Sequence, residues 1–432
     1  MDPSGHEVTL AVVGAGSRGT GYARLAAAIP GCRVVAVAEP DRQRRAAFVA
    51  EHGLSRSAAS AGWAELAAAD HGADAVIVAT QDALHADPAV AFLEQDRHVL
   101  LEKPMAPTEP EAVRIAEAAA AARRRSGGGL VFGVCHVLRY TPYTAAFVEV
   151  VRSGRVGRPV SIQHLEPVGW WHQAHSYVRG NWRREDESGP MLLTKSCHDL
   201  DWLIHVMGRP VARVSSFGGL AHFRADDRPP GATDRCLTCP VEPTCPYSAP
   251  RLYLGLLAQG RGGQWPLSVL TPGTTEEAVR DALATGPYGR CVYHCDNDVV
   301  DHQVVNLEFE GGATGSFTMT AFTPTGGRRT RLFGTHGSIE GDGTTLAVTD
   351  FRDGTVTTVD PATLGPASGH DAASGHGGGD GGLVRAFVAA VAAGDPSLLA
   401  TDEVESLAGH RVVWAAERAR ANGTVETVAP GA

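Results

Sequence analysis

The stretch that decides the fold lies near the N-terminus and reads Val8-Thr9-Leu10-Ala11-Val12-Val13-Gly14-Ala15-Gly16-Ser17-Arg18-Gly19. The residues before the first glycine are mostly apolar and β-branched, as in a strand buried on both faces. The glycines match the G-x-G-x-x-G pattern, and an alanine-rich helical stretch over residues 20–29 follows them. A strand, a glycine turn and a helix in this order are typical of a nucleotide-binding βαβ unit.

An acidic residue completes this pattern. A second apolar strand, over residues 34–38, ends at Glu39, which follows Gly19 at the interval of about 20 residues expected for a carboxylate on an adenosine ribose. Gly14 and Gly16 would let the backbone approach a pyrophosphate, and Gly19 would let the helix pack on the strand. Glu39 favours NAD over NADP because it would repel a 2′-phosphate, but three cations that oppose this preference follow it, namely Arg42, Arg44 and Arg45. The alternatives are an unrelated glycine turn, or an adenine-nucleotide site without redox chemistry.

Strands and helices continue to alternate up to about residue 139. We expect strands over residues 74–80, 98–101 and 130–135, and helices over 83–95 and 109–125. This alternation predicts the doubly wound parallel sheet of a Rossmann domain over residues 1–139, whose ligands bind at the carboxyl ends of the strands. Besides the three glycines and Glu39, the predicted cofactor-binding residues are Ser17, Arg18, Thr80, Gln81, His85, Glu102 and Lys103.

The pattern changes after Tyr140. We expect helices over residues 141–152 and 191–207, and strands over 159–165, 211–223, 303–309, 314–321, 328–333, 338–339, 345–348 and 355–359. Glycine pairs and Asp-Gly turns separate several strands, as in hairpins. Residues 140–432 are therefore predicted to form an α+β domain with a large, mainly antiparallel open sheet. One face would carry helices, and the free face would form the interface of a homodimer or homotetramer.

The end of the chain is predicted to hold a linker and two helices. Residues 365–382 are rich in Gly, Ser, His and Asp, which favours a solvated loop around His370 and His376 over a segment that folds onto a substrate. Helices are expected over residues 383–392 and 402–422.

Composition excludes several classes of protein. The chain has 432 residues, of which 48 are acidic and 38 basic, and its net charge of −10 argues against a nucleic-acid or anionic-membrane partner. No apolar run is long enough to span a bilayer, and the first residues, MDPSGHEV, lack the features of a signal peptide. We therefore expect a cytoplasmic protein, whose eight cysteines are mostly reduced or metal-bound.

A group of aromatic and polar residues is predicted to bind a carbohydrate. Aromatic faces stack on sugar C–H faces, while Arg, Asn and His bind hydroxyl or anionic groups. Residues 170–183 show little periodicity, as expected of a binding loop, although a surface loop packed on its own tryptophans is the alternative. The predicted substrate-binding residues are His136, Arg139, Tyr140, His172, His175, Arg179, Asn181 and Trp182.

Five cysteines lie in an insertion, residues 224–296, which is rich in Pro and Gly. The spacing Cys236-x2-Cys239-x5-Cys245, followed by Cys291-x3-Cys295, predicts that four of these thiols hold a structural zinc ion. Such a metal would supply stability that the few apolar residues of the insertion cannot. An iron–sulfur cluster, free thiols and an exposed disulfide are the alternatives.

The glycine pattern, the triplet Glu102-Lys103-Pro104 and a later helix with His198 and Asp201 resemble the Gfo/Idh/MocA oxidoreductases, which include glucose–fructose oxidoreductase and inositol dehydrogenase. The resemblance covers essentially the whole chain. It implies that Lys103 and His198 lie beside the nicotinamide and the reacting sugar carbon. It also implies an NAD-dependent oxidoreductase that acts on a sugar, sugar acid or cyclitol.

The two implied catalytic residues leave several alternatives open. One of Lys103 and His198 would be the base and the other an orienting donor, unless Lys103 is only an ion-pair partner of Glu102 and His198 only a buried helix residue. The same pair would serve an NAD-dependent glycosidase that oxidises a sugar transiently and then reduces it again. A non-catalytic sensor is the third hypothesis, and the presence of both residues disfavours it.

The sequence departs from the family pattern at one point. The family has an aspartate four residues before the helix histidine, whereas this chain has Thr194 followed by Lys195. A cation near the reacting carbon suggests an anionic substrate, with Lys195 as a catalytic or substrate-binding group and Asp199 beside it. The alternative is an ion pair between Lys195 and Asp199, its i+4 neighbour.

Overall fold

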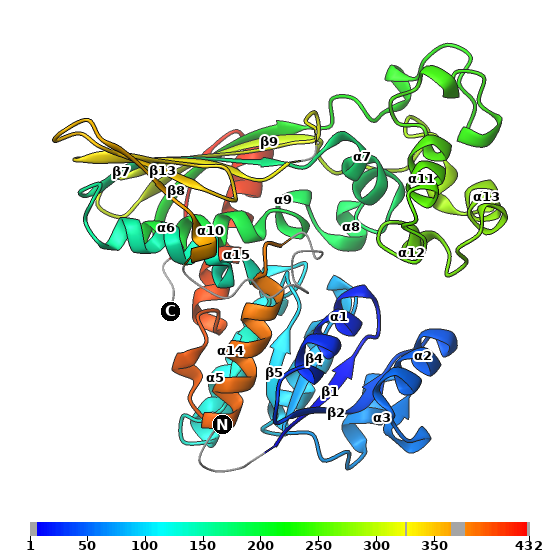
Figure 1. Cartoon of the computed structure of the whole chain (residues 1–432), viewed down its shortest axis with the longest axis horizontal. Helices are drawn as coiled ribbons and strands as arrows, with labels where there is room; N and C mark the ends of the chain where they lie inside the picture. The colour runs from blue at the N-terminus through cyan, green and yellow to red at the C-terminus, as the bar shows by residue number, and fades with distance from the viewer. Residues whose placement is uncertain (1–6, 325, 364–375, 430–432) are drawn as a thin grey trace.

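A computed structural model describes residues 7–324, 326–363 and 376–429. Two sheets form the molecule, one parallel and one mainly antiparallel, with helices between them (Figure 1). Both predicted fold classes are thus confirmed, while the domain boundary near residue 140 stays a prediction. Residues 365–375 of the predicted linker, His370 among them, lie outside the described residues.

The parallel sheet has six strands in the order β3-β2-β1-β4-β5-β6, which is the arrangement of a dinucleotide-binding fold. Its crossover helices cover both faces (Figure 1). The strands are β1 Val8–Val13, β2 Cys32–Ala38, β3 Ala59–Ser60, β4 Ala75–Val78, β5 His98–Leu101 and β6 Phe132–Val134. The helices are α1 Ser17–Ala27, α2 Arg42–His52, α3 Trp63–Ala68, α4 Ala86–Glu94 and α5 Glu109–Arg125.

The second sheet has nine strands in the order β14-β13-β12-β11-β7-β10-β9-β8-β15. Neighbouring strands are antiparallel except for β10 and β7, which run parallel. The strands are β7 Pro159–Pro167, β8 Val211–Gly219, β9 His302–Phe309, β10 Thr314–Thr320, β11 Arg329–Gly334, β12 Gly337–Gly341, β13 Leu346–Asp350, β14 Val356–Val359 and β15 Val425–Thr427.

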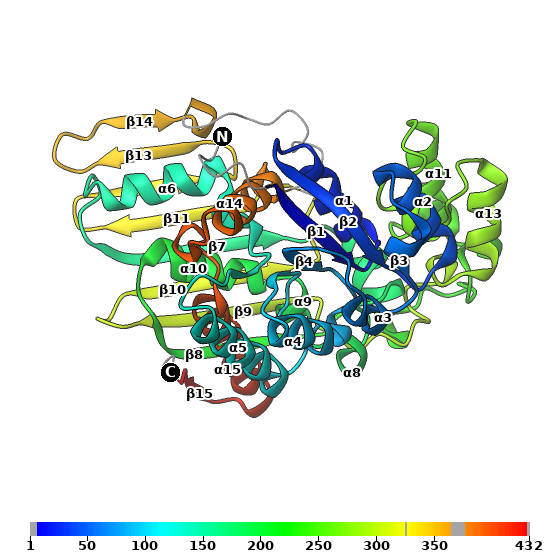
Figure 2. The ribbon, with the colours of Figure 1, turned by 90° about the horizontal axis from the view of Figure 1, so that it is seen from below.

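Helices cover the face of this sheet that looks toward the parallel sheet, and no helix of the described residues covers the other face (Figure 1). The covering helices are α6 Pro142–Arg152, α9 Met191–Thr194, α10 Cys197–Met207 and α15 Glu403–Asn422. One apolar core runs from β5 and α5 through α10 and α15 to β9 and β10, so the two halves share their packing. Helix α14, Gly379–Ala393, instead packs on α1 and β1 within the core of the parallel sheet (Figure 2).

The insertion forms a lobe at one end of the molecule, beside α7 (Trp170–His172) and α8 (Glu185–Ser188) (Figure 1). It holds α11 Ala249–Ala258, α12 Leu267–Leu270 and α13 Glu276–Thr285. Its apolar side chains form a core of their own, which includes Tyr253, Leu267 and Leu283. The expectation that this segment is too poor in apolar residues to form a core was therefore wrong.

The structure corrects two other local predictions. Residues 170–183 are mostly not an irregular loop, because α7 continues into a π-helix over Gln173–Arg179. The expected helix over residues 191–207 is two helices, α9 and α10, which break at Lys195 and Ser196. No helix of the described residues is long and apolar enough to cross a membrane.

A buried ion pair ties three elements together at the edge of the parallel sheet. Arg139, in the turn after β6, donates two hydrogen bonds to the carboxylate of Asp201 on α10, at 2.8 and 2.7 Å. It donates a third to the carbonyl oxygen of Ala400, just before α15, at 2.7 Å. Both charged side chains are at most 2% exposed. Burial alone would raise the pKa of Asp201, but the charge and hydrogen bonds of Arg139 hold it below its ordinary value.

Replacing Arg139 by Met should lower the free energy of unfolding by about 3–5 kcal/mol at pH 7, because it leaves the Asp201 carboxylate buried without its partner. Since the pKa of Asp201 is lowered in the folded state, the stabilisation is present above the ordinary carboxyl value and is lost as the pH falls through the folded value. Urea unfolding at pH 7 and pH 3 should show the difference between the two proteins shrinking in acid. The exposed pair of Arg213 with Glu308 provides the control, and Arg213→Met should cost under about 1 kcal/mol. An equal loss of unfolding free energy in Arg139→Met and Arg213→Met would contradict this account.

Candidate active site

The turn between β1 and α1 requires glycine at two of its three glycine positions. Gly14 has a φ of +92°, and a Cβ there would lie 2.5 Å from the carbonyl oxygen of Ala79. A Cβ on Gly19 would lie 1.9 Å from the carbonyl oxygen of Gly14, whereas one on Gly16 would meet nothing within 4 Å. The turn is therefore tight on the protein side and open on the other, and α1 begins at Ser17 with its free N–H groups at this opening. This arrangement fits a dinucleotide pyrophosphate.

Glu39 is in place at the end of β2 to meet an adenosine ribose. Its carboxylate is 3% exposed and accepts hydrogen bonds from the backbone N–H of Ala15 and Asp41, both at 2.8 Å. Arg44 donates to the same carboxylate at 2.8 Å. These bonds fix the orientation of Glu39 beside the glycine turn, and they show that the nearest arginine is already paired with it.

The loop after β4 contributes both exposed and buried groups. Thr80 and Gln81 are near the surface, and the hydroxyl of Thr80 donates to the carbonyl oxygen of Leu84 at 3.0 Å. His85 is fully buried, and its ring nitrogens lie 2.8 Å from the carbonyl oxygen of Pro104 and 3.3 Å from that of Thr80. His85 thus joins this loop to the loop after β5, while Thr80 and Gln81 remain available to a ligand.

Arg18 connects Glu102, after β5, to the C-terminal part of the chain. Arg18 on α1 donates to Glu102 at 2.5 Å and to Asp380, at the start of α14, at 2.7 Å. Tyr22 also donates to Glu102, at 3.1 Å. Burial would raise the pKa of Glu102, but the charges of Arg18 and Lys103 hold it below its ordinary value. Glu102 is therefore an ionised acid that positions Arg18.

Lys103 contacts the helix pair that carries His198. Its ammonium donates to the carbonyl oxygen of Thr194, the last residue of α9, at 2.6 Å. His198 lies in the first turn of α10, is 4% exposed, and has no hydrogen-bond partner on Nδ1. Burial first, and then the charges of Lys103 and His136, hold the pKa of His198 well below its ordinary value. The imidazole is therefore neutral at pH 7.

Lys195 does not pair with Asp199. Its ammonium lies 3.1 Å from the carboxylate of Glu166 on β7, which also binds Arg328 at 3.1 Å. Asp199 is fully buried and is bound by Arg328 and by His164, at 3.0 Å for the latter. Lys195 and Arg328 are balanced by Glu166 and Asp199 in one network. The suggested i+4 ion pair between Lys195 and Asp199 does not form. Nothing in the local sequence pattern pairs Lys195 with Glu166, because sheet topology brings them together.

The residues after β6 mostly support the site from behind. His136 is fully buried, with its ring centroid 5.8 Å from that of His198 and 5.4 Å from that of His410. The hydroxyl of Tyr140 lies 3.0 Å from the Thr401 hydroxyl and accepts from the N–H of Ala400. Arg139 is held by Asp201 and the Tyr140 hydroxyl by Thr401 and Ala400, so both polar groups are engaged within the protein.

The helical segment after β7 divides its polar groups between two sides. The His172 ring packs on Trp265 of the insertion, with 5.1 Å between centroids, and burial and then the charge of Lys195 hold its pKa well below its ordinary value. Trp182 lies toward the parallel sheet, where its indole N–H donates to Asp82 at 2.9 Å. Asn181 is exposed. Asp82, which directly follows Gln81, is a residue of this region that the sequence analysis does not predict. Burial raises the pKa of its carboxyl group.

His175 and Arg179 point into the insertion. A ring nitrogen of His175 lies 2.8 Å from the Tyr253 hydroxyl, and the imidazole stacks on Tyr288 at 4.7 Å between centroids. Arg179 is 1% exposed and donates to the carbonyl oxygens of Arg290 and Tyr247, both at 2.8 Å. These two residues hold the insertion against the segment, which explains their polarity without a substrate.

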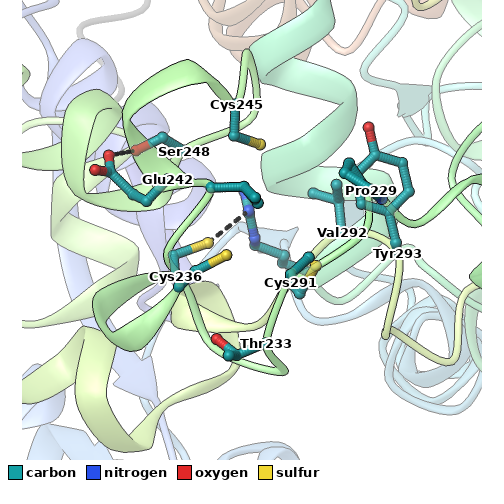
Figure 3. A pocket seen from close by; sticks show the side chains of 13 residues that line it. Pro229, Thr233, Cys236, Glu242, Cys245, Ser248, Cys291, Val292 and Tyr293 are labelled. Atoms are coloured by element: carbon teal, nitrogen blue, oxygen red, sulfur yellow. Dashed lines mark hydrogen bonds between the residues drawn. The ribbon is translucent and has the colours of Figure 1, made fainter.

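The cysteines of the insertion gather around one pocket but do not form a metal site. Cys236, Cys245 and Cys291 point into it (Figure 3), Cys239 lines it as well, and Arg179 donates to the Cys236 sulfur at 3.5 Å. The Cys295 thiol turns to the carbonyl oxygen of Cys291. Among the residues that the structure describes, no group of three or more His, Cys, Asp or Glu side chains stands in an arrangement that could hold a metal ion. The zinc prediction therefore receives no support.

Several named proteins are similar to this chain. The 1,5-anhydro-D-fructose reductase of Ensifer adhaerens is 30% identical over 202 residues, which cover 46% of this chain and 56% of that one. The scyllo-inositol 2-dehydrogenase (NAD(+)) of Bacillus subtilis (strain 168) is 25% identical over 219 residues, or 49% of this chain and 58% of that one. The chain thus spans less than two thirds of these relatives.

A solved structure is similar in fold over almost the whole chain. Levoglucosan dehydrogenase, in complex with NADH and levoglucosan, superposes with a TM-score of 0.70 at 18% sequence identity. The alignment covers 98% of this chain and 100% of that one. At 18% sequence identity, this similarity shows a shared fold.

Two family descriptions match the chain. Residues 8–127 match the oxidoreductase family's NAD-binding Rossmann fold, and residues 148–423 match its C-terminal alpha/beta domain. These matches cover most of the sequence and include the glycine turn, Lys103 and His198. The chain therefore belongs to the Gfo/Idh/MocA family of oxidoreductases.

Proposed function

We propose that the protein is an NAD-dependent oxidoreductase that oxidises a hydroxyl group of a sugar or cyclitol, or reduces the corresponding ketone. The observation that carries this proposal is the contact between Lys103, after the end of β5, and the carbonyl oxygen of Thr194, four residues before His198. A strand end of the parallel sheet thereby reaches the helix pair that carries the buried, neutral imidazole of His198. The printed names of the relatives, an anhydrofructose reductase and an inositol dehydrogenase, agree with this chemistry.

His198 and Lys103 would have different roles. When bound, NAD supplies the acceptor for the hydride. His198 takes the proton of the substrate hydroxyl, because its lowered pKa keeps the imidazole neutral. Lys103, as an ammonium donor, orients the substrate oxygen and stabilises the negative charge that develops on it.

The pairing of charges favours an uncharged substrate. Lys195 and Arg328 are matched by Glu166 and Asp199, so the cation that suggested an anionic sugar has its counter-ion within the protein. A sugar acid would need a cation that is free to bind it. The polyol class represented by inositol and levoglucosan therefore fits the site better.

Glu39 supports the choice of NAD over NADP. Its buried carboxylate is oriented by Ala15 and Asp41, and Arg44 is engaged by it rather than free to bind a 2′-phosphate. Fluorescence titration should therefore give a dissociation constant for NADH at least about tenfold below that for NADPH.

Gly19→Ala should weaken NADH binding by at least about tenfold, because its Cβ would collide with the Gly14 carbonyl and distort the turn that holds the pyrophosphate. Gly21→Ala, in the same helix, adds a methyl group where nothing lies within 4 Å. It should bind NADH normally and be no less stable than the wild type. Normal NADH binding by Gly19→Ala would show that the turn does not hold the cofactor.

Substrate screening tests the reaction itself. The protein should produce NADH from NAD and a polyol in a panel that contains scyllo-inositol, myo-inositol and levoglucosan. Aryl glycosides should be included, because release of phenol without net NADH would indicate the redox-neutral glycosidase instead.

Lys103→Met should lower turnover by about 10²–10⁴-fold, in the range for loss of a group that assists proton transfer or stabilises the developing oxyanion. NADH binding should change by less than about threefold, since Glu102, Arg18 and the glycine turn remain. Absorbance at 340 nm and fluorescence titration measure the two quantities. Unchanged turnover would remove Lys103 from the mechanism.

A further inference from the structure

His376 lies next to His198, although the two are far apart in the sequence. Their ring centroids are 6.0 Å apart, a separation that one water molecule can bridge between ring nitrogens. His198 is almost fully buried, with a side chain that has one unpartnered nitrogen. The His376 side chain is 29% exposed. The pair therefore connects a buried imidazole to one that reaches solvent.

Asp380 holds His376 in this position. One oxygen of its carboxylate lies 3.0 Å from Nδ1 of His376, and the other accepts from Arg18 at 2.7 Å. Burial would raise the pKa of Asp380, but His376 and Arg18 hold it well below its ordinary value. A carboxylate on Nδ1 selects the tautomer in which Nδ1 carries the hydrogen, and this leaves Nε2 to exchange protons.

Glycines at the start of α14 make this placement possible. A Cβ on Gly379 would lie 2.2 Å from the carbonyl oxygen of Val137, and one on Gly382 would lie 2.5 Å from that of Tyr140. The first turn of α14 thus packs directly on the backbone after β6, next to the active site. The glycine-rich composition that suggested a solvated linker here reflects close packing.

We propose that His376, paired with Asp380, relays the substrate proton from His198 to solvent. The inference rests on the proposed oxidoreductase function. In the oxidation direction, the carbinol C–H bond breaks and its hydride reduces NAD, while the hydroxyl proton passes to His198. That proton then moves to Nε2 of His376 and on to water, so the alcohol becomes a ketone and one proton is released. His376 acts through His198 and is a positioning residue for the proton, not a group that contacts substrate.

The surrounding charges favour this direction of transfer. A proton on His198 would face the cations Lys103 and Arg328, so the protonated form is disfavoured there. The His376 ring, in contrast, has the Asp380 carboxylate 3.0 Å from its Nδ1 and reaches solvent. Four titratable or charged groups face the pair: Lys103 after β5, His136 after β6, Arg328 before β11 and Asp380 in α14. Arg18 of α1 binds the other oxygen of Asp380.

The test is the variant His376→Asn, assayed with a polyol that the wild type oxidises. Its kcat should fall by at least about tenfold at pH 6–7, with a smaller loss at pH 9, because hydroxide can then take the proton directly. Added imidazole should restore part of the lost rate. KM and the dissociation constant for NADH should stay within about twofold. The same substitution at the exposed His336, between β11 and β12, is the matched control and should leave the pH profile unchanged.

A second measurement does not depend on turnover. Nuclear magnetic resonance of protein labelled with ¹⁵N-histidine should show His376 in the tautomer protonated on Nδ1, and Asp380→Ala should abolish that preference. A pH profile for His376→Asn equal to the wild type, with no rescue by imidazole, overturns the relay and leaves the oxidoreductase function standing. Failure of the wild type to oxidise any polyol overturns the function and the relay together.

Discussion

The hydrogen bond from the Lys103 ammonium to the Thr194 carbonyl oxygen is the contact on which the active site depends. It joins the end of a parallel strand to the helix pair α9 and α10, which lies under the second sheet. On one side of this contact Glu102 holds Arg18 at the glycine turn, and on the other His198 occupies the first turn of α10. Neighbouring residues at one strand end thus contact the glycine-turn helix on one side and the helix pair that carries His198 on the other.

Paired buried charges keep the site electrically balanced. Arg139 is matched by Asp201, and Arg18 lies between Glu102 and Asp380. Because an unpaired buried charge is costly, these partners decide which groups remain free to act. His198 has no carboxylate partner among the described residues, and we propose it as the neutral base. His376 has one, and in the proposed relay this difference gives the proton a direction.

Sequence patterns predict features that depend on residues close together in the chain. They do not predict contacts between segments that only the fold brings together. The βαβ unit follows from short-range patterns that the fold preserves. The roles expected of Lys103 and His198 come from the resemblance to the family. The pairing of Lys195 with Glu166 depends on how β7 lies against α9, and the place of His376 depends on α14 packing on the parallel sheet. The π-helix over Gln173–Arg179 lacks the 3.6-residue period that identifies an α-helix, so the sequence pattern predicts a loop there. Cysteine spacing suggested a metal site that the side chains do not form.

The most direct test of hydride transfer uses a substrate that carries deuterium on the carbinol carbon being oxidised. Mass spectrometry of the cofactor after turnover should show one deuterium on the nicotinamide for each ketone formed, because the hydride moves directly between the two carbons. The solvent should contain none. Deuterium found in water rather than on the nicotinamide would contradict direct transfer, and with it the arrangement of Lys103 and His198 proposed for this site.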